Sequence, residues 1–385
     1  MIPVIEPSLG DEELNNVIEA VKSGWISSKG KFVLEFETNF AKYHGMGNSV
    51  ATSNGTVALN LALNALGIKN GDEIIVPVLT FAATANAVIY CNARPVYVDS
   101  HSDYWCIDPE KIEEKITKNT KAIIPVHLYG HPCDMGWIMD IAEDHDLYVV
   151  EDAAEAHGAE YKGKKVGSFG DISCFSFYGN KIITTGEGGI CLTKDEDLIE
   201  KMKVLRDHGM DPSKRYWHDV IGFNYRMTNL QAAIGVAQLN KLDNFLKKKK
   251  QIAKLYKEGL KDLAETNKIT LHPEMPWAKC SYWIYSILIE NEYGIEINRL
   301  IENLEVEKID TRPFFYPINT MPPYKSSEIF PIAEEISKKG ISLPSSINLT
   351  KEDIFEVIKC IKDLDSYKNS NMEKMSKNSL STFNV

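Results

Sequence analysis

A single lysine, Lys181, stands in the segment SCFSFYGNKIITTGEGGI (residues 173–190), which otherwise carries little charge. It could be a buried nucleophile, a phosphate-binding lysine or an ordinary surface lysine. The Walker phosphate motif has its glycines before the lysine and a helix after it, whereas here glycines follow the lysine, so that interpretation fails. The neighbouring residues are mostly apolar and indicate an enclosed site: Phe175, Phe177, Tyr178, Ile182 and Ile183. In such a site desolvation lowers the pKa of an amine, which makes imine formation feasible near neutral pH.

A phosphate group could bind at two places in the sequence. The turn SNGT (residues 53–56) follows a predicted strand and opens a predicted helix, whose first N–H groups and positive dipole end suit an anion. Gly55 and Thr56 are therefore candidate phosphate-binding residues, although N-capping by the first two residues of the turn explains the same pattern. Ser176, in the lysine segment, could donate its hydroxyl to the same phosphate.

Two carboxylates and one aromatic residue also follow predicted strands. Asp152 ends the strand LYVVED, and Glu155 lies three residues further on. Because a lone buried carboxylate is costly, Asp152 needs a partner, which could be a protonated heterocyclic nitrogen or an ordinary structural cap or salt bridge. Phe81 follows the strand IIVPVLT, where it could stack on a flat ring or simply pack in the core. An imine-forming lysine, a ring-nitrogen acid, a stacking aromatic and a helix-start phosphate site together meet the requirements of pyridoxal phosphate.

Strand and helix patterns alternate through the first part of the chain, which predicts an α/β domain (residues 1–240) with a mainly parallel sheet covered on both faces. The runs CFSFY and GGICLT stand too close together for a crossover helix, so we expect an antiparallel pair there. PEKIEEKI predicts a helix. In open α/β sheets, ligands bind beyond the carboxyl ends of strands, where the candidate residues fall.

The pattern changes at about Thr228, where a long Leu-rich helix begins. We expect it to lead into a smaller C-terminal α+β domain (residues 241–367), with strands at WIYSILIE and KIDTRPFF. A terminal helix should start at a Thr350 cap. The polar residues 368–385 predict a disordered tail.

Composition excludes several classes of function. A net charge of -11 and a pI of about 5.4 argue against binding to a nucleic-acid backbone. We expect a cytoplasmic protein without a membrane partner, because the sequence shows no signal peptide and no long apolar stretch. Seven scattered cysteines indicate reduced, mostly buried thiols. His131 and Cys133 resemble half of a metal site, but no second ligand cluster accompanies them, so we expect no metal.

Five segments together carry a family resemblance: SNGTVAL, PVLTFAATANA, VEDAAEAHG, SFYGNKIITTGEGG and GFNYRMTN. With them, residues 2–365 resemble the DegT/DnrJ/EryC1/StrS sugar aminotransferases. The resemblance implies a fold-type I, aspartate aminotransferase-like pyridoxal phosphate enzyme. Within that family the chain is most similar to the GDP-perosamine synthase type, through WISSKGKFVLEFE, VHLYGHPCDM, RYWHDVIGFNYRMTN and TRPFFYPINTMPPY.

The resemblance also implies roles for individual residues around the cofactor ring. Lys181 would form the Schiff base and later move a proton. Asp152 would pair with the pyridinium nitrogen, Glu155 would lie near the ring hydroxyl, and Phe81 would stack on one ring face.

Further implied roles concern the phosphate, the partner subunit and the substrate. Gly55, Thr56 and Ser176 would hold the phosphate, and Asn224 would reach it from the second subunit of a homodimer. Residues near the substrate would be Trp25, Ser27, Tyr316 and Asn319.

Two positions depart from the family pattern. Tyr178 stands where perosamine synthases commonly have Phe, beside the lysine. Asn319 stands where they commonly have His, in the substrate region, so it bears on substrate identity and not on cofactor chemistry. Related dehydratases replace the lysine by His, and the intact Lys181 favours aminotransfer.

The resemblance thus predicts transfer of an amino group from L-glutamate to a keto substrate. The first hypothesis is a GDP-linked 4-keto-6-deoxy sugar, aminated for a surface polysaccharide such as capsule or lipopolysaccharide. The alternative is a small keto phosphate, such as dihydroxyacetone phosphate aminated to serinol phosphate, for which Asn319 is the only indication. Two rival classes are a non-catalytic ligand-binding or regulatory protein, and a nucleotide phosphatase built on TTGEGG.

Overall fold

The computed structural model describes the backbone of residues 1–380 and the side chains of residues 1–365. A seven-stranded sheet with the order β1-β9-β8-β5-β4-β2-β3 forms its centre. The strands are β1 (Asn48–Thr52), β2 (Glu73–Pro77), β3 (Arg94–Val98), β4 (Thr120–Ile123), β5 (Tyr148–Asp152), β8 (Ile172–Ser176) and β9 (Gly189–Thr193). From β3 to β8 neighbouring strands run parallel, and β9 runs antiparallel to both β8 and β1. The predicted mainly parallel α/β sheet with an antiparallel pair is confirmed.

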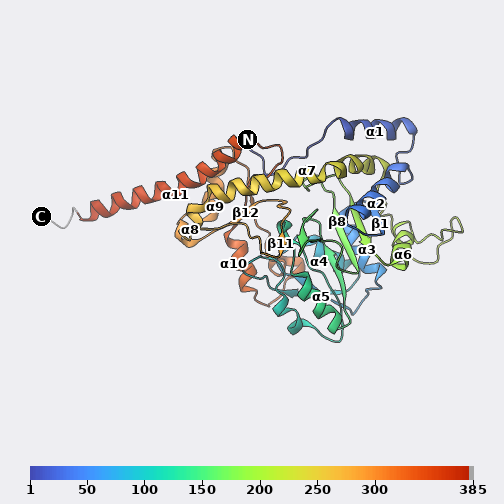
Figure 1. The fold of residues 1–385 in the computed structure, drawn as a ribbon. Coiled ribbons are helices and arrows are strands. Elements are labelled where there is room, and N and C mark those ends of the chain that lie inside the picture. The colour runs from blue at the N-terminus through green and yellow to red at the C-terminus, as the bar shows by residue number, and fades with distance from the viewer. Residues whose placement is uncertain (381–385) are drawn as a thin grey trace.

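Helices follow the strands as the alternating pattern predicts (Figure 1). They are α3 (Gly55–Ala65), α4 (Ala82–Tyr90), α5 (Met135–Asp144) and α6 (Glu196–Arg206). Helix α3 packs on β8 and β9, and α5 packs on β5. The strands are apolar, as expected for a sheet covered on both faces, and five of the seven (β1, β2, β5, β8 and β9) are buried along all or nearly all of their length.

A long helix, α7 (Asn229–Gly259), runs along one side of the molecule and joins its two ends (Figure 1). It begins at a capping box, in which Thr228 Oγ1 accepts from Gln231 N (3.2 Å) and Gln231 Oε1 accepts from Thr228 N (2.8 Å). The N-terminal helices α1 (Asp11–Ser23) and α2 (Lys31–Tyr43) pack against α7.

The C-terminal part holds a second, four-stranded sheet with the order β10-β12-β14-β13. Its elements are α8 (Lys261–Glu265), β10 (Ile269–Thr270), β12 (Ser286–Ile289), α9 (Ile297–Val306), β13 (Arg312–Pro313), α10 (Pro331–Lys339), β14 (Gly340–Ser342) and α11 (Lys351–Leu380). Tyr256, Leu300 and Ile358 belong to a second apolar core, but Trp283 and Phe314 pack into the main core. The division at residue 240 stays a prediction, and α7 crosses it.

A small three-stranded sheet ties the two parts together. Strand β11 (Ala278–Lys279) pairs with β6 (Glu160–Tyr161), which pairs with β7 (Lys164–Lys165). This pairing joins segments that are more than 100 residues apart in the sequence. It also places the residues after β11 beside those after β5, where Ser281 Oγ donates to Glu155 O at 3.4 Å.

Some predicted elements differ in the structure. PEKIEEKI forms two single 3₁₀ turns, Pro109–Lys111 and Glu113–Lys115, instead of one helix, because the backbone is already extended at Ile116 (φ -73°, ψ 130°), which ends the segment. KIDTRPFF contributes only the two-residue strand β13. The predicted cap of the last helix is confirmed, since Thr350 Oγ1 accepts from Asp353 N at 3.1 Å. Of the predicted disordered tail, residues 368–385, the backbone up to Leu380 belongs to α11 and residues 381–385 lie outside the described residues, so the disorder of the tail stays a prediction.

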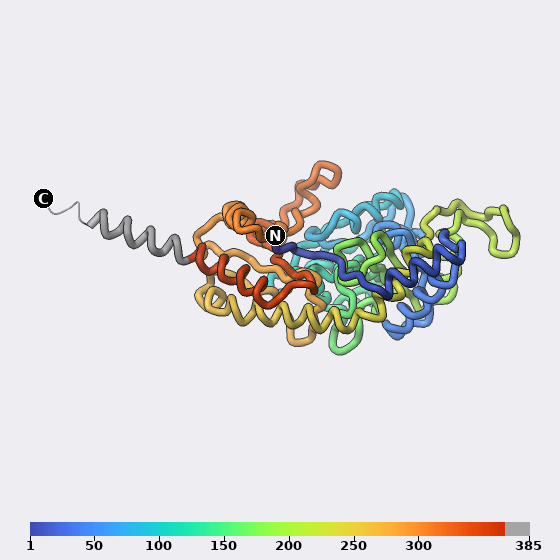
Figure 2. Tube along the Cα trace, turned by 90° about the horizontal axis from the view of Figure 1, so that it is seen from above, coloured from blue at the N-terminus to red at the C-terminus, as the bar shows by residue number. Residues whose placement is uncertain are grey.

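One segment projects from the body. The residues between Asp207 and Asn224, which are bridged at their base, extend outward beyond α6 in both views (Figures 1 and 2). Four large apolar side chains on it are exposed: Tyr216, Trp217, Val220 and Ile221. Within the described residues, no helix combines the length and apolar character needed to cross a bilayer. All seven cysteines are unpaired, and six of them are buried.

Candidate active site

A cavity of about 700 Å³ opens where β2, β5 and β8 end. Its lining combines the start of α3, the residues after β2, the end of β5, the lysine segment and two aromatic residues from the C-terminal part. The residues are Asn54, Gly55, Thr56, Val57, Leu59, Thr80, Phe81, Ala83, Tyr90, Val126, Asp152, Ala154, Glu155, Ser176, Tyr178, Asn180, Lys181, Glu187, Trp283 and Phe315. The sheet topology thus brings together every cofactor-binding residue predicted from the sequence except Asn224.

The start of α3 forms a cradle for an anion. Asn54 caps the helix, because its side chain accepts from Val57 N at 3.0 Å, which leaves the earlier N–H groups without intrahelical partners. A Cβ on Gly55 would lie 2.7 Å from Ser176 Cβ, so only glycine lets the helix start approach this serine. The same turn can therefore both cap the helix, through Asn54, and bind an anion, through the start of α3 at Gly55 and Thr56.

Lys181 reaches the cavity as a nearly buried amine. Its side chain is 11% exposed, and its Nζ lies 3.7 Å from Glu155 Oε1 and 3.7 Å from the centroid of the Trp283 ring. Burial lowers the pKa of Lys181, although Glu155 and Asp152 oppose that shift by attraction. Burial also raises the pKa of Glu155 to about 7, against the attraction of Lys181 and a hydrogen bond from Tyr129 N (2.8 Å). Desolvation outweighs attraction at both groups, so the pair tends toward neutral forms.

Asp152 presents a buried carboxylate at the end of β5. Thr84 Oγ1 donates to Asp152 Oδ2 at 2.8 Å, and Ala154 N donates to Oδ1 at 3.2 Å. Despite these bonds, burial raises the pKa of Asp152. Any cationic group that enters the cavity would stabilise the charged form of this buried carboxylate. A protonated ring nitrogen is such a group.

A second acidic residue supports the same strand from its other face. Consecutive strand residues point to opposite sides, so Glu151 points away from the cavity. It is fully buried and lies 3.2 Å from His127 Nε2. It also accepts hydrogen bonds from four groups in residues 167–173: Gly167 N, Phe169 N, Gly170 N and Ser173 Oγ. These contacts fix the end of β5, and sequence reasoning missed them.

Aromatic side chains form the walls. Phe81 is 59% exposed toward the cavity, and its ring centroid lies 5.8 Å from that of Phe315. Core packing therefore does not explain Phe81, and the stacking hypothesis fits its position. Phe315 and Trp283 were not predicted, because they come from the C-terminal part and no local pattern marks them.

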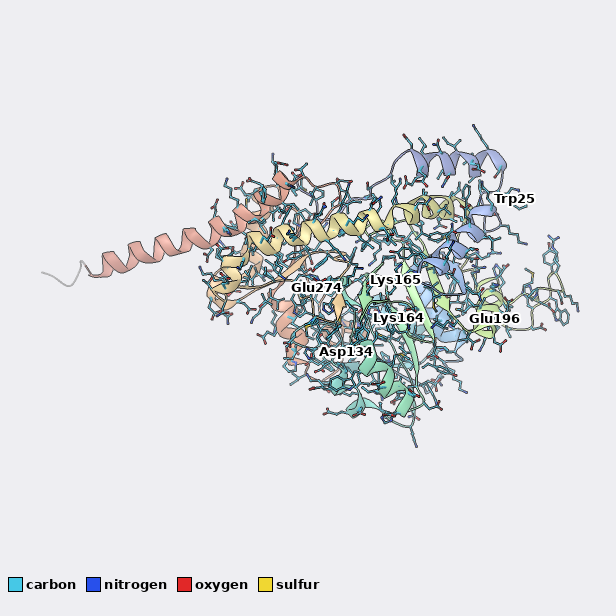
Figure 3. The ribbon with its side chains drawn as sticks, in the orientation of Figure 1. Trp25, Asp134, Lys164, Lys165, Glu196 and Glu274 are labelled. Carbon is cyan, nitrogen blue, oxygen red and sulfur yellow. The ribbon has the colours of Figure 1, made fainter. Side chains whose placement is uncertain are left out.

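The predicted substrate residues do not line this cavity, and neither does Asn224. Trp25 lies at the outer edge of the molecule near α1 and α2, where it is largely exposed (Figure 3). Tyr316 is exposed, and Asn319 is buried in its own loop, where its Nδ2 donates to Glu328 O at 3.1 Å. Their roles, like that of Ser27, stay predictions.

The cavity suits pyridoxal phosphate in its chemistry. The α3 cradle meets the phosphate, the buried Asp152 meets a ring nitrogen, and the exposed face of Phe81 meets a flat ring. Lys181 supplies an amine whose pKa is lowered, as imine formation requires. Within the described residues there is no group of three side chains that could hold a metal ion.

Known proteins match this chain over nearly its whole length. Residues 7–362 match the model of the DegT/DnrJ/EryC1/StrS aminotransferase family. GDP-perosamine synthases of Escherichia coli O157:H7 and Vibrio cholerae are 47% and 43% identical over 95% and 94% of this chain, and over 99% of each relative.

Solved structures share the fold. An aminotransferase from Psychrobacter cryohalolentis is 30% identical with a TM-score of 0.89, covering 94% of this chain and 98% of its own. DesV of Streptomyces venezuelae is 33% identical with a TM-score of 0.86, covering 92% and 94%. The predicted fold class and resemblance are confirmed: the chain belongs to the DegT/DnrJ/EryC1/StrS aminotransferase family and is an aminotransferase.

Proposed function

We propose that the cavity binds pyridoxal phosphate and that the protein moves an amino group from L-glutamate to a GDP-linked 4-keto-6-deoxy sugar. The observation that carries the cofactor assignment is the convergence of Lys181, Asp152 and the Gly55–Ser176 cradle on one cavity. The aminated sugar would serve a surface polysaccharide, and we expect the reaction to take place in the cytoplasm.

Each residue contributes to one part of this reaction. The bound cofactor supplies an electron sink for the carbon that loses its proton. Lys181 Nζ would hold the cofactor through its aldehyde and, when its amine is free, would act as the base that takes the Cα proton of the amino donor and as the acid that delivers this proton to the cofactor. General acid–base catalysis of this kind contributes about 10²–10⁴-fold. Asp152 would hold positive charge on the ring nitrogen, an electrostatic contribution that is strengthened because Asp152 itself is buried.

The sugar assignment is supported by the relatives. Two proteins that are 43% and 47% identical to this chain over nearly its whole length are named as GDP-perosamine synthases. A small keto phosphate is the other candidate, because of Asn319. Since Asn319 is buried within its loop, an effect of this residue on a substrate would act through the shape of the loop.

We further propose an active-site homodimer. Asn224 and Trp25 lie outside their own chain's cavity, while the projecting segment between residues 207 and 224 exposes apolar side chains. In a dimer, this segment would cover the partner's cavity and bring Asn224 to its phosphate. Mixing inactive Lys181→Ala and Asn224→Ala proteins should then restore part of the activity, because one of the two mixed sites carries neither change. No recovery after verified subunit exchange would refute the shared site.

The cofactor and the substrate need separate tests. The purified protein should be yellow, and borohydride should fix the cofactor to the peptide containing Lys181, whereas Lys181→Ala protein should show neither property. A colourless protein that does not bind added pyridoxal phosphate would refute the cofactor assignment. Incubation with glutamate and either a GDP-linked 4-keto-6-deoxyhexose or dihydroxyacetone phosphate, followed by mass spectrometry, identifies the acceptor. An amine formed only from the keto phosphate would refute the sugar assignment.

A further inference from the structure

Lys249, on α7, is a buried lysine that the proposed reaction does not use. It is 3% exposed, and among the described residues it makes no ion pair with a carboxylate. Instead, its Nζ donates to two backbone carbonyls, Trp283 O at 2.8 Å and Ser345 O at 2.6 Å. Burial lowers the pKa of Lys249 to about 7. A methionine would fill similar space without this desolvation, so packing alone does not require a lysine here.

One of the two carbonyls that Lys249 binds belongs to Trp283, whose ring lies against the Lys181 amine. The Trp283 indole Nε1 donates to Asn180 O at 2.7 Å, which fixes the backbone just before Lys181. The face of the same ring lies 3.7 Å from Lys181 Nζ, and the ring stacks near Tyr129 with an interplanar angle of 18°. Lys249 therefore holds the backbone of Trp283, while the indole N–H of Trp283 holds the carbonyl of Asn180 and its ring face lies against the Lys181 amine.

The two lysines are also neighbours in space. Both line a small cavity of about 10 Å³, which has room for about one water molecule. The other polar side chains around it are those of Glu6, Ser8, Thr184, Gln238 and Ser346, of which Glu6 carries the only carboxylate and is exposed. Only this small cavity lies between the side chains of Lys249 and Lys181, so a change at Lys249 occurs close to the active amine.

We propose that Lys249 is a positioning residue for Lys181: by binding the Trp283 carbonyl it keeps the indole ring against the Lys181 amine. The effect on Lys181 follows from cation–π attraction. A ring held against an ammonium group stabilises the charged form, so loss of the ring's position lowers the pKa of Lys181. The importance of Lys181 for the reaction rests on the proposed function, but the link from Lys249 to Lys181 does not.

The test measures the pKa of Lys181 directly, in the full-length protein after removal of cofactor. Cyanate modifies neutral amines, and the rate at the peptide containing Lys181 is followed by mass spectrometry from pH 6 to 10. We expect Lys249→Met to lower this pKa by about 0.5–1 unit, as for loss of a partly desolvated cation–π contact. Lys248→Met, at the exposed neighbouring lysine of the same helix, should leave it unchanged.

A double-mutant cycle distinguishes positioning from a general loss of structure. Trp283→Leu, which removes the aromatic face, should lower the pKa of Lys181, and adding Lys249→Met to Trp283→Leu should produce no further shift. An equal shift from Lys249→Met in both backgrounds, or no shift in the wild-type background, would overturn the proposal. If Lys249→Met does not fold, Trp283→Leu decides: an unchanged pKa of Lys181 overturns the proposal, and a lowered pKa supports it. A wrong cofactor or substrate would change neither result, because the measurement involves no cofactor and no turnover.

Discussion

Three buried histidines should make the free energy of unfolding fall as the pH drops below neutral. Burial lowers the pKa of His44 to about 4, and those of His157 and His272 to about 3, from an ordinary value of 6.5. The unfolded chain therefore binds protons at these residues below pH 6.5, while the folded chain does not. Stability from this source is complete above pH 6.5 and is lost as the pH falls toward the folded values.

The size of the effect follows from these values. At pH 5 each histidine of the unfolded chain gains about 2 kcal/mol from protonation, or about 6 kcal/mol for the three. Glu155 acts in the opposite direction, because burial raises its pKa to about 7 and the folded chain takes up its proton first. That contribution is about 2 kcal/mol between pH 7 and pH 5, which leaves a net loss of about 3–4 kcal/mol.

Equilibrium urea unfolding at pH 7, 6 and 5 and constant ionic strength measures this loss. His272→Asn isolates one contribution, because the asparagine Oδ1 can take the place of His272 Nδ1 as acceptor for Ser286 N. In this variant the loss between pH 7 and pH 5 should be smaller by about 2 kcal/mol than in the wild-type protein. Equal pH dependence of His272→Asn and wild-type protein would refute the assignment of the effect to buried neutral histidines.

Three further predictions concern the cavity. Asp152→Asn should lower kcat by about 10²–10³ while the cofactor still binds, because an amide cannot hold positive charge on the ring nitrogen; a loss of less than tenfold contradicts this. Gly55→Ala should weaken pyridoxal phosphate binding at least about tenfold, since its Cβ would meet Ser176 Cβ at 2.7 Å, whereas Gly47→Ala, with open space around it, serves as the control in the same titration. Glu155→Gln should lower the pKa of Lys181, because it removes a negative charge 3.7 Å from Nζ, and cyanate modification at lower pH would show it; an unchanged or raised pKa would mean that the pair is not coupled.

The chemistry of the site was predictable because its residues sit at the ends of locally recognisable elements. Asp152 ends a strand and Gly55 starts a helix, and a parallel sheet brings such ends to one edge. Lys181 could be distinguished from a phosphate-loop lysine by the order of its neighbours alone.

The walls of the site were not predictable in the same way. Trp283 and Phe315 reach the cavity through contacts between segments more than 100 residues apart in the chain, such as the bond from Trp283 to Asn180. Hydrophobic periodicity reports which face of an element is buried but not against which other element. For the same reason the sequence did not reveal that Glu151 and His127 brace the end of β5, or that a lysine on α7 binds the backbone of Trp283.

The ionisable groups of the cavity and part of its aromatic wall come from different parts of the chain, so the substrate that the enzyme accepts can change separately from its cofactor site. Every ionisable group in the cavity comes from the first 190 residues, and the aromatic residues Trp283 and Phe315 come from a separate part of the chain. Substitutions near Phe315 can thus reshape the entrance while Asp152 and the phosphate cradle keep their surroundings. Libraries confined to residues 310–330 should alter which ketone is accepted at little cost to cofactor retention, whereas libraries in residues 150–190 should lose both together.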